Sequence, residues 1–138
     1  MPLVLDTGPL LAALDAADPD HDRCAELLMS AEEDLVVPSL VLAELDYWCH
    51  QRLGVDAWIT FLEDMLAGVY RLEDATTADL ERCRDLQVQY KDQMLGVVDA
   101  SVLALVERLG ENKLGTLDHR HFSVLRPSHV QALRLLPQ

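Results

Sequence analysis

The sequence predicts a three-layer α/β/α sandwich on a mainly parallel β-sheet, formed by a single domain over residues 1–138. Two observations lead to this fold class. Short apolar runs of strand length alternate with longer stretches in which apolar residues recur at helical spacing, a pattern typical of parallel sheets covered by helices. Half of the residues are hydrophobic, which is enough for one continuous core without crosslinks.

The expected strands are short apolar runs bounded by turn residues. In order, they cover residues 2–5, 35–37, 69–72, 114–117 and 132–136. The first strand ends at Asp6-Thr7-Gly8-Pro9, where glycine and proline indicate a break into a loop and a helix. The last strand, just before Pro137, is expected at an edge of the sheet.

The expected helices carry apolar residues three and four positions apart. After the helix that follows Pro9, they cover residues 19–33, 40–53, 55–67, 77–90 and 97–110. Asp18 (with Pro19 in the first turn), Ser39 and the pair Thr76-Thr77 are expected to cap the N-termini of three of these helices. Gly54 is expected to end the second of them.

The chain is strongly acidic, with 24 acidic and 11 basic residues and a formal net charge of −13. This balance counts against a protein that holds nucleic acid in a broad basic groove, because such binding depends on neutralising phosphates. Metal ions bound by clustered carboxylates would reverse the local field, so a substrate that contains phosphate is compatible with the charge. A basic protein partner is a second explanation for the acidity.

The cysteines and the apolar runs indicate the environment of the protein. Cys24, Cys49 and Cys83 are odd in number and widely spaced, so we expect buried thiols rather than disulfides or zinc ligands. No apolar run reaches the roughly 20 residues that span a bilayer, and Met1-Pro2-Leu3-Val4 lacks the basic region of a signal peptide. The expected location is the cytoplasm, with no membrane association.

Four carboxylates stand on apolar backgrounds in separate parts of the chain: Asp6, Glu44, Asp99 and Asp118. A buried carboxylate is costly unless it is protonated, paired or bound to metal, so a shared divalent cation is expected. Asp6 and Asp118 follow strands, and parallel strands bring such residues to one edge of the sheet. Oxygen ligands favour Mg²⁺ or Mn²⁺ over zinc. For each acid alone, helix capping or a helix-dipole role remains the alternative.

Four segments around these acids resemble, in order, the motifs of PIN-domain ribonucleases of the VapC toxin type. The segments are Leu5–Leu11, Val37–Leu45, Gly96–Ser101 and Gly115–Phe122. The resemblance covers essentially the whole chain and implies a PIN-like fold and a Mg²⁺- or Mn²⁺-dependent endoribonuclease. It implies that the four acids are the catalytic, metal-binding quartet.

The resemblance also implies a role for each acid and for nearby residues. Asp6, Asp99 and Asp118 would be direct metal ligands, while Glu44 would bind a second ion or the attacking water. Three further residues match positions near the quartet in relatives. Thr7 and Thr116 would be supporting or water-positioning groups, and Asp92 would lie at the rim of the pocket.

Partners follow from the same resemblance. The substrate would be RNA, in some relatives a structured RNA such as tRNA, and a VapB-type antitoxin would silence the site with a basic residue. Homodimers are also expected, with the aromatic helix from Val55 to Ala67 either forming their apolar surface or closing the core. Among the basic residues, Arg120 and Lys91 are the candidates for RNA contact, because they adjoin the motif acids.

The aromatic and histidine side chains are assigned structural roles. Trp48, Trp58 and Phe61 occur at helical spacing, which favours core or dimer packing over base stacking. His119 and His121 are expected in a surface turn rather than as metal ligands.

Three other functions compete with the ribonuclease. A phosphohydrolase with Asp6 as nucleophile usually requires a second aspartate two positions on, where this chain has Gly8. A phospho-accepting receiver domain would need a lysine that closes a late strand, whereas Lys113 precedes its strand. A catalytically silent PIN-like binding module is disfavoured by the four acids, but it remains open.

Overall fold

A five-stranded sheet, parallel throughout, lies at the centre of the structure, a computed structural model that describes residues 1–138. The strands are β1 (Pro2–Leu5), β2 (Asp34–Pro38), β3 (Arg71–Glu73), β4 (Lys113–Gly115) and β5 (Arg134–Leu136). Their spatial order is β3-β2-β1-β4-β5, so the first strand in sequence is the central one. The predicted α/β/α class is confirmed, and the sheet is wholly rather than mainly parallel.

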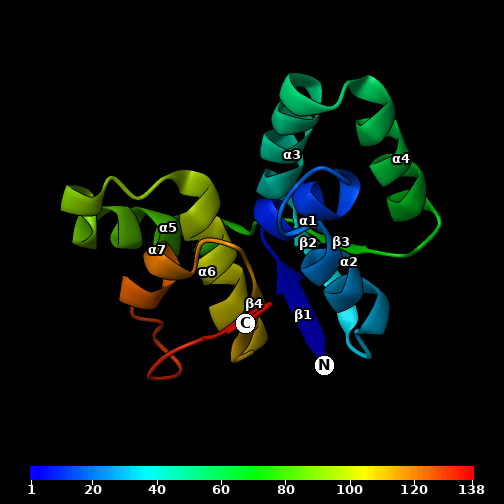
Figure 1. The fold of residues 1–138 in the computed structure, drawn as a ribbon. Helices are drawn as coiled ribbons and strands as arrows, with labels where there is room; N and C mark the ends of the chain where they lie inside the picture. The colour runs from blue at the N-terminus through cyan, green and yellow to red at the C-terminus, as the bar shows by residue number, and fades with distance from the viewer.

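Seven α-helices and one 3₁₀ helix connect the strands. They are α1 (Thr7–Leu14), α2 (His21–Ser30), α3 (Ser39–Arg52), α4 (Val55–Leu66), α5 (Thr77–Gln89), the 3₁₀ helix η1 (Lys91–Gln93), α6 (Val97–Leu109) and α7 (His119–Val124). In Figure 1, α5, α6 and α7 lie on one side of β1 and α1 to α4 on the other, with the α3–α4 pair projecting from the body. None of these helices combines the length and hydrophobicity needed to cross a bilayer.

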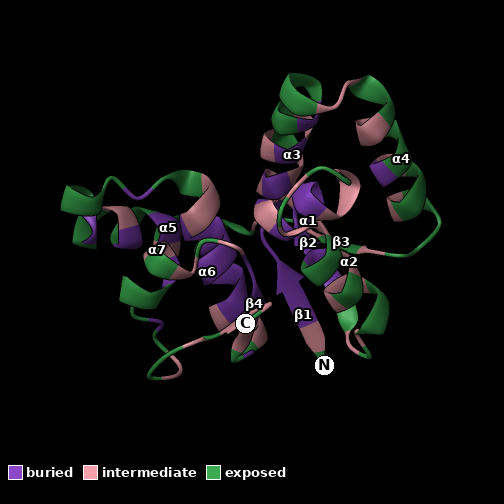
Figure 2. Cartoon of the chain, viewed as in Figure 1, coloured by how far each residue is buried: buried purple, intermediate pink, exposed green.

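The core is built around β1, because a central parallel strand is covered on both faces and its side chains must all be apolar. Leu3, Val4 and Leu5 are all buried. Leu3 pairs with Leu35 of β2, and Val4 pairs with Leu114 of β4. Figure 2 shows the burial of β1 and α6 against the exposed far ends of α3 and α4.

Several predicted boundaries were wrong by a few residues. Asp18 does not cap α2, because the helix begins only at His21, after Asp20. The strands expected over 69–72 and 114–117 are β3 and β4, shifted to 71–73 and 113–115, and the edge strand β5 is shorter than expected. Thr76 caps α5 as predicted, in a reciprocal capping box with Asp79.

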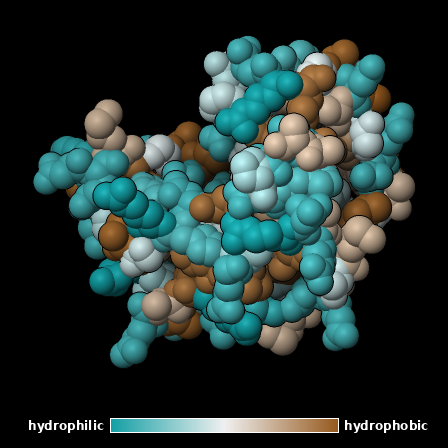
Figure 3. Space-filling view, viewed as in Figure 1, coloured by the Kyte–Doolittle hydropathy of each residue, from teal (hydrophilic) through white to brown (hydrophobic).

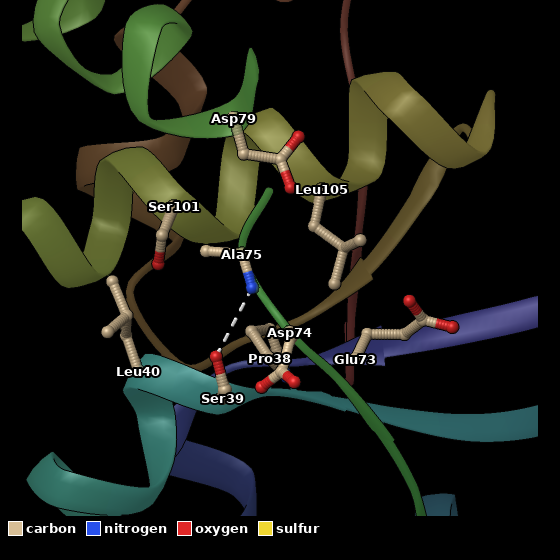
Figure 4. A pocket seen from close by; sticks show the side chains of 9 residues that line it. All are labelled: Pro38, Ser39, Leu40, Glu73, Asp74, Ala75, Asp79, Ser101 and Leu105. Carbon is tan, nitrogen blue, oxygen red and sulfur yellow. Dashed lines mark hydrogen bonds between the residues drawn. The ribbon is translucent and has the colours of Figure 1, made fainter. Parts of the chain in front are cut away.

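Ser39 was also wrongly expected to be a cap, because it is the first residue of α3 itself and Pro38 precedes it. Its hydroxyl instead accepts a hydrogen bond from the Ala75 backbone N–H at 3.4 Å (Figure 4). Ser39 thus joins the start of α3 to the segment that follows β3. The cavity drawn in Figure 4 is only about 10 Å³ in volume, close to the size of one water.

The aromatic residues of α4 pack inward. Phe61 is buried and stacks on Trp58 and Tyr70, with ring centroids 5.6 Å and 5.2 Å apart. Core packing is therefore confirmed for Phe61 and, in part, for Trp58, and Phe61 cannot supply a dimer surface. The three cysteines are buried free thiols, as predicted.

Candidate active site

Asp6 occupies the point where β1 turns into α1 at the carboxyl edge of the sheet. The Asp6 backbone N–H donates to the Gly115 carbonyl at 2.7 Å, which extends the pairing of β1 with β4. Glycine at position 115 leaves room for the Leu5 side chain, because a Cβ there would lie 2.7 Å from Leu5 Cδ2 and that side chain would have to shift. The neighbouring Thr116 hydroxyl donates to Asp6 Oδ2 at 3.0 Å.

The Asp6 carboxylate is only half satisfied. Its Oδ1 is buried and has no hydrogen-bond partner, and although Asp6 stands at the cap position of α1, its side chain makes no capping bond. Burial, reinforced by the negative charge of Asp99, raises the pKa of Asp6 to about 7. The ionised form of the Asp6 carboxylate is therefore destabilised in the folded protein, and a cation bound beside it would stabilise that form.

Two acids are presented by helices beside Asp6. Asp99 stands in the first turn of α6, and Glu44 lies on α3 one turn after the buried Val41. Burial raises the pKa of Asp99 above its ordinary value, the charges of Glu44 and Asp118 act in the same direction, and His121 opposes them. The four carboxylates therefore lie close enough for electrostatic repulsion between them.

Asp118 completes the group from the segment between β4 and α7. It precedes α7, and its Oδ1 accepts the His121 backbone N–H at 3.1 Å, so Asp118 caps α7 while its other oxygen, Oδ2, makes no such bond. The Asp118 backbone N–H donates to the Thr116 hydroxyl at 3.1 Å. Thr116 therefore links Asp6 to the segment that carries Asp118, although it lies beneath the cleft rather than on its wall.

The four predicted acids line one open cleft of about 500 Å³. Its lining residues are Asp6, Thr7, Gly8, Leu11, Asp18, Glu44, Trp48, Arg52, Asp99, Leu117 and Asp118. Figure 1 shows the elements that carry these residues, with α1 beginning at the tip of β1 and lying between α3 and α6. Thr7 belongs to the lining as a buried residue whose hydroxyl has no partner.

The cleft also contains residues that the sequence did not point to. Trp48 was expected to pack in a core or dimer, but it lines the cleft with 37% of its surface exposed. The preference for core packing was wrong for this residue, although its spacing of four from Glu44 was a usable signal. His121 does not line the cleft, but its Nε2 lies 3.4 Å from Oδ2 of the cleft residue Asp99, a contact that the expected surface turn did not indicate.

Other predicted residues lie outside the cleft. Asp92 and Lys91 are exposed on η1 and do not line it. Arg120 lines a neighbouring hollow together with Asp118 and His121. Lys113 pairs with Glu33 at the start of β4, the end of that strand away from Asp118, so the arrangement of a receiver domain is absent.

Comparison with known proteins places this geometry in a family. The sequence model of the protein family described as the PIN domain matches residues 3–126 of this chain. The chain belongs to the PIN domain family. It is also 40% identical to Ribonuclease VapC26 of Mycobacterium tuberculosis (strain ATCC 25618 / H37Rv) over 125 residues, which cover 91% of this chain and 93% of that relative.

Solved structures of low sequence identity share the PIN-domain fold. VapC20 of Mycobacterium tuberculosis, a toxin that cleaves the sarcin-ricin loop, matches with a TM-score of 0.78 and 22% identity, over 85% of this chain and 90% of that one. VapBC2 of Rickettsia felis, bound to a DNA fragment from its promoter, matches with a TM-score of 0.70 and 19% identity, over 98% and 97%. The predicted resemblance to PIN-domain ribonucleases of the VapC type is confirmed.

The side chains in the cleft are of the kind that binds a divalent cation, but they are not yet positioned to hold one. The unpartnered Asp6 Oδ1 and the surrounding carboxylates form the oxygen-rich donor set that Mg²⁺ and Mn²⁺ prefer. As the side chains stand, no three His, Cys, Asp or Glu residues are grouped closely enough to hold a metal ion. Without a cation, the carboxylates repel one another. A bound cation would offset this repulsion, and the side chains would then have to turn toward one another to hold it.

Proposed function

We propose that this PIN-domain protein is a metal-dependent endoribonuclease whose working residues are Asp6, Glu44, Asp99 and Asp118. The proposal depends chiefly on one observation, the buried and unpartnered Oδ1 of Asp6 in a cleft lined by three further carboxylates. A buried group of this kind is costly for stability and is typical of sites that bind a charged ligand.

Each acid is proposed to act in the hydrolysis of an RNA phosphodiester bond. Asp6, Asp99 and Asp118 would hold Mg²⁺ or Mn²⁺, which supplies a water of lowered pKa and stabilises negative charge on the scissile phosphate. Glu44, on a separate helix, would orient the attacking water or hold a second ion. Thr116 would keep the Asp6 carboxylate in place through its hydrogen bond to Oδ2, and Thr7 would position water.

A cleavage assay tests this function. Total RNA is incubated with purified, antitoxin-free protein and Mg²⁺, Mn²⁺ or EDTA, beside the variants Asp6→Asn and Asp99→Asn. Asp85→Asn, at an exposed acid on α5, is the matched control. Discrete fragments that depend on metal and are lost in the two cleft variants are expected. Absence of cleavage by folded protein that binds metal would favour a silent binding module.

The proposed partner is a VapB-type antitoxin that inserts a basic residue among the four acids. The net charge of −13 and the single basic residue on the cleft wall, Arg52, support such a partner. The VapBC complexes among the structural neighbours are consistent with it. Structured RNA, tRNA included, is the proposed substrate class, with Arg120 as a phosphate contact beside Asp118.

A homodimer in the cytoplasm is the proposed state of the protein. Val55, Ile59 and Leu66 of α4 are exposed apolar side chains that a second copy would cover, and Figure 3 shows brown atoms along the edge of the α3–α4 projection. Three unpaired thiols fit a reducing compartment. Light scattering would report a monomer for Ile59→Asp if α4 is the interface, and an unchanged dimer would exclude it.

A further inference from the structure

A polar and aromatic stripe runs along α3 from the acid cluster. Glu44, Trp48 and Arg52 are spaced four residues apart, so they lie on one face of the helix, and all three line the cleft. The stripe extends for about 12 Å along the helix axis. An acid, a flat aromatic ring and a cation thus follow one another outward from the proposed catalytic group.

Trp48 presents a ring held in place from two directions. The Arg52 guanidinium carbon lies 5.1 Å from the centroid of the indole. Tyr47 packs edge-on to the same ring, with centroids 5.1 Å apart and an interplanar angle of 86°. An indole that is partly exposed and restrained in this way can accept a second flat group without reordering itself.

Arg52 contacts the Trp48 ring but no carboxylate. It makes no ion pair and no hydrogen bond, whereas Arg82 and Arg108 are each bound to carboxylates of neighbouring elements. The cleft is lined by eleven residues, and Arg52 is the only basic one among them. In an acidic cleft, a cation that no carboxylate pairs with, held beside an aromatic ring, is suited to a ligand that carries both a flat ring and a negative charge.

Building on the proposed ribonuclease function, we propose that Trp48 and Arg52 form a subsite for one nucleotide of single-stranded RNA. The base next to the scissile phosphate stacks on the Trp48 indole, and the adjoining phosphate contacts the Arg52 guanidinium. Stacking of this kind tolerates any base, since every base has a π-face. The subsite therefore positions the strand without reading its sequence.

The first test follows binding through tryptophan fluorescence. The chain has two tryptophans, so Trp58→Phe leaves Trp48 as the sole reporter and Trp48→Phe leaves Trp58, which stacks on Phe61. Both are made in an Asp6→Asn background, so that the probe, oligoadenylate, is not consumed. Saturable quenching is expected only where Trp48 remains. Equal quenching in both proteins, or none in either, would overturn the proposal.

The second test follows cleavage by the active protein, on an RNA oligonucleotide that contains a mapped cleavage site. Trp48→Ala is expected to lower kcat/KM by about tenfold or more. Trp48→Phe is expected to retain most of the parent value of kcat/KM, and Arg52→Gln is expected to lower it. Arg84→Gln, at an exposed arginine of α5, is the matched control and leaves it unchanged. Values for Trp48→Ala within twofold of the parent protein would refute the subsite.

The two tests separate this proposal from the function it is built on. Quenching of Trp48 without cleavage would support the subsite while the ribonuclease proposal fails. Cleavage that does not depend on Trp48 would leave the ribonuclease in place and remove the subsite. If Trp48→Ala weakens only the complex with an antitoxin, the stripe is a protein-binding surface and the RNA subsite is excluded.

Discussion

At the scale of single residues, the buried carboxylate of Asp6 makes stability depend on pH. Its pKa rises from an unfolded value of about 3.9 to about 7 because of burial and the charge of Asp99. The native state therefore binds the proton more tightly than the unfolded state, and the stability gained below about pH 4 is lost as the pH rises through 7.

The measurement is the free energy of unfolding by urea at pH 5 and pH 8, in EDTA. Asp6→Asn removes the titrating group, so this variant should gain more stability relative to the parent protein at pH 8 than at pH 5. The difference should be on the order of a few kcal/mol, since one pKa unit is worth about 1.4 kcal/mol. An equal offset at both pH values would show that Asp6 titrates normally.

Thr116 is a second residue whose hydroxyl has a measurable role, because it joins Asp6 to the Asp118 segment. Thr116→Val keeps the shape of the fully buried side chain but removes both hydrogen bonds. We expect a loss of about 1–3 kcal/mol in stability and weaker Mn²⁺ binding. Thr116→Ser is the matched control, and calorimetry would contradict the role if the two variants bound Mn²⁺ equally.

At the scale of helices, α5 and α6 are joined by a bidentate ion pair. Glu107 accepts from Arg82 Nε at 2.7 Å and from Arg82 Nη2 at 3.0 Å, and it also accepts the Ser128 backbone N–H. Glu107→Gln should destabilise the protein by about 1–3 kcal/mol, because charged hydrogen bonds to a partly buried carboxylate are lost. Asp85→Asn breaks an exposed pair and should cost at most about 1 kcal/mol.

Chemical denaturation of Glu107→Gln and Asp85→Asn measures how far each variant lowers the free energy of unfolding. Equal and small effects would mean that the α5–α6 contact depends on apolar packing alone.

The elements also show what local sequence can predict. The Thr76 cap was predictable because the capping box is a contact between residues three apart. Asp18 was misassigned as a cap because several acids in that loop, Asp20 among them, offer the same local signal. The four acids were found through their apolar surroundings, whereas the exposure of Trp48 depends on how α3 lies over the cleft, which no short window of sequence contains.

At the scale of the whole molecule, net charge limits how the protein can hold RNA. With Arg52 and Arg120 as the proposed phosphate contacts near the acids, log K for a single strand should fall against log[salt] with a slope of about −1.4, from about −0.7 per phosphate. Fluorescence anisotropy of a labelled oligonucleotide, measured with Asp6→Asn protein at several salt concentrations, gives this slope.

Arg52→Gln should make the slope shallower by about 0.7, while Arg84→Gln should leave it unchanged. A slope several times steeper would reveal a basic surface elsewhere on the molecule.

The position of β1 at the centre of the sheet has a consequence for synthesis of the chain. β1 is made first, but its neighbour β4 and the residues Thr116 and Asp118 are made more than a hundred residues later. Asp6 cannot meet its partners across β4 until that late segment has left the ribosome. The cleft therefore acquires its four acids only after most of the protein has been made, and the RNA cleavage proposed for them would begin only then.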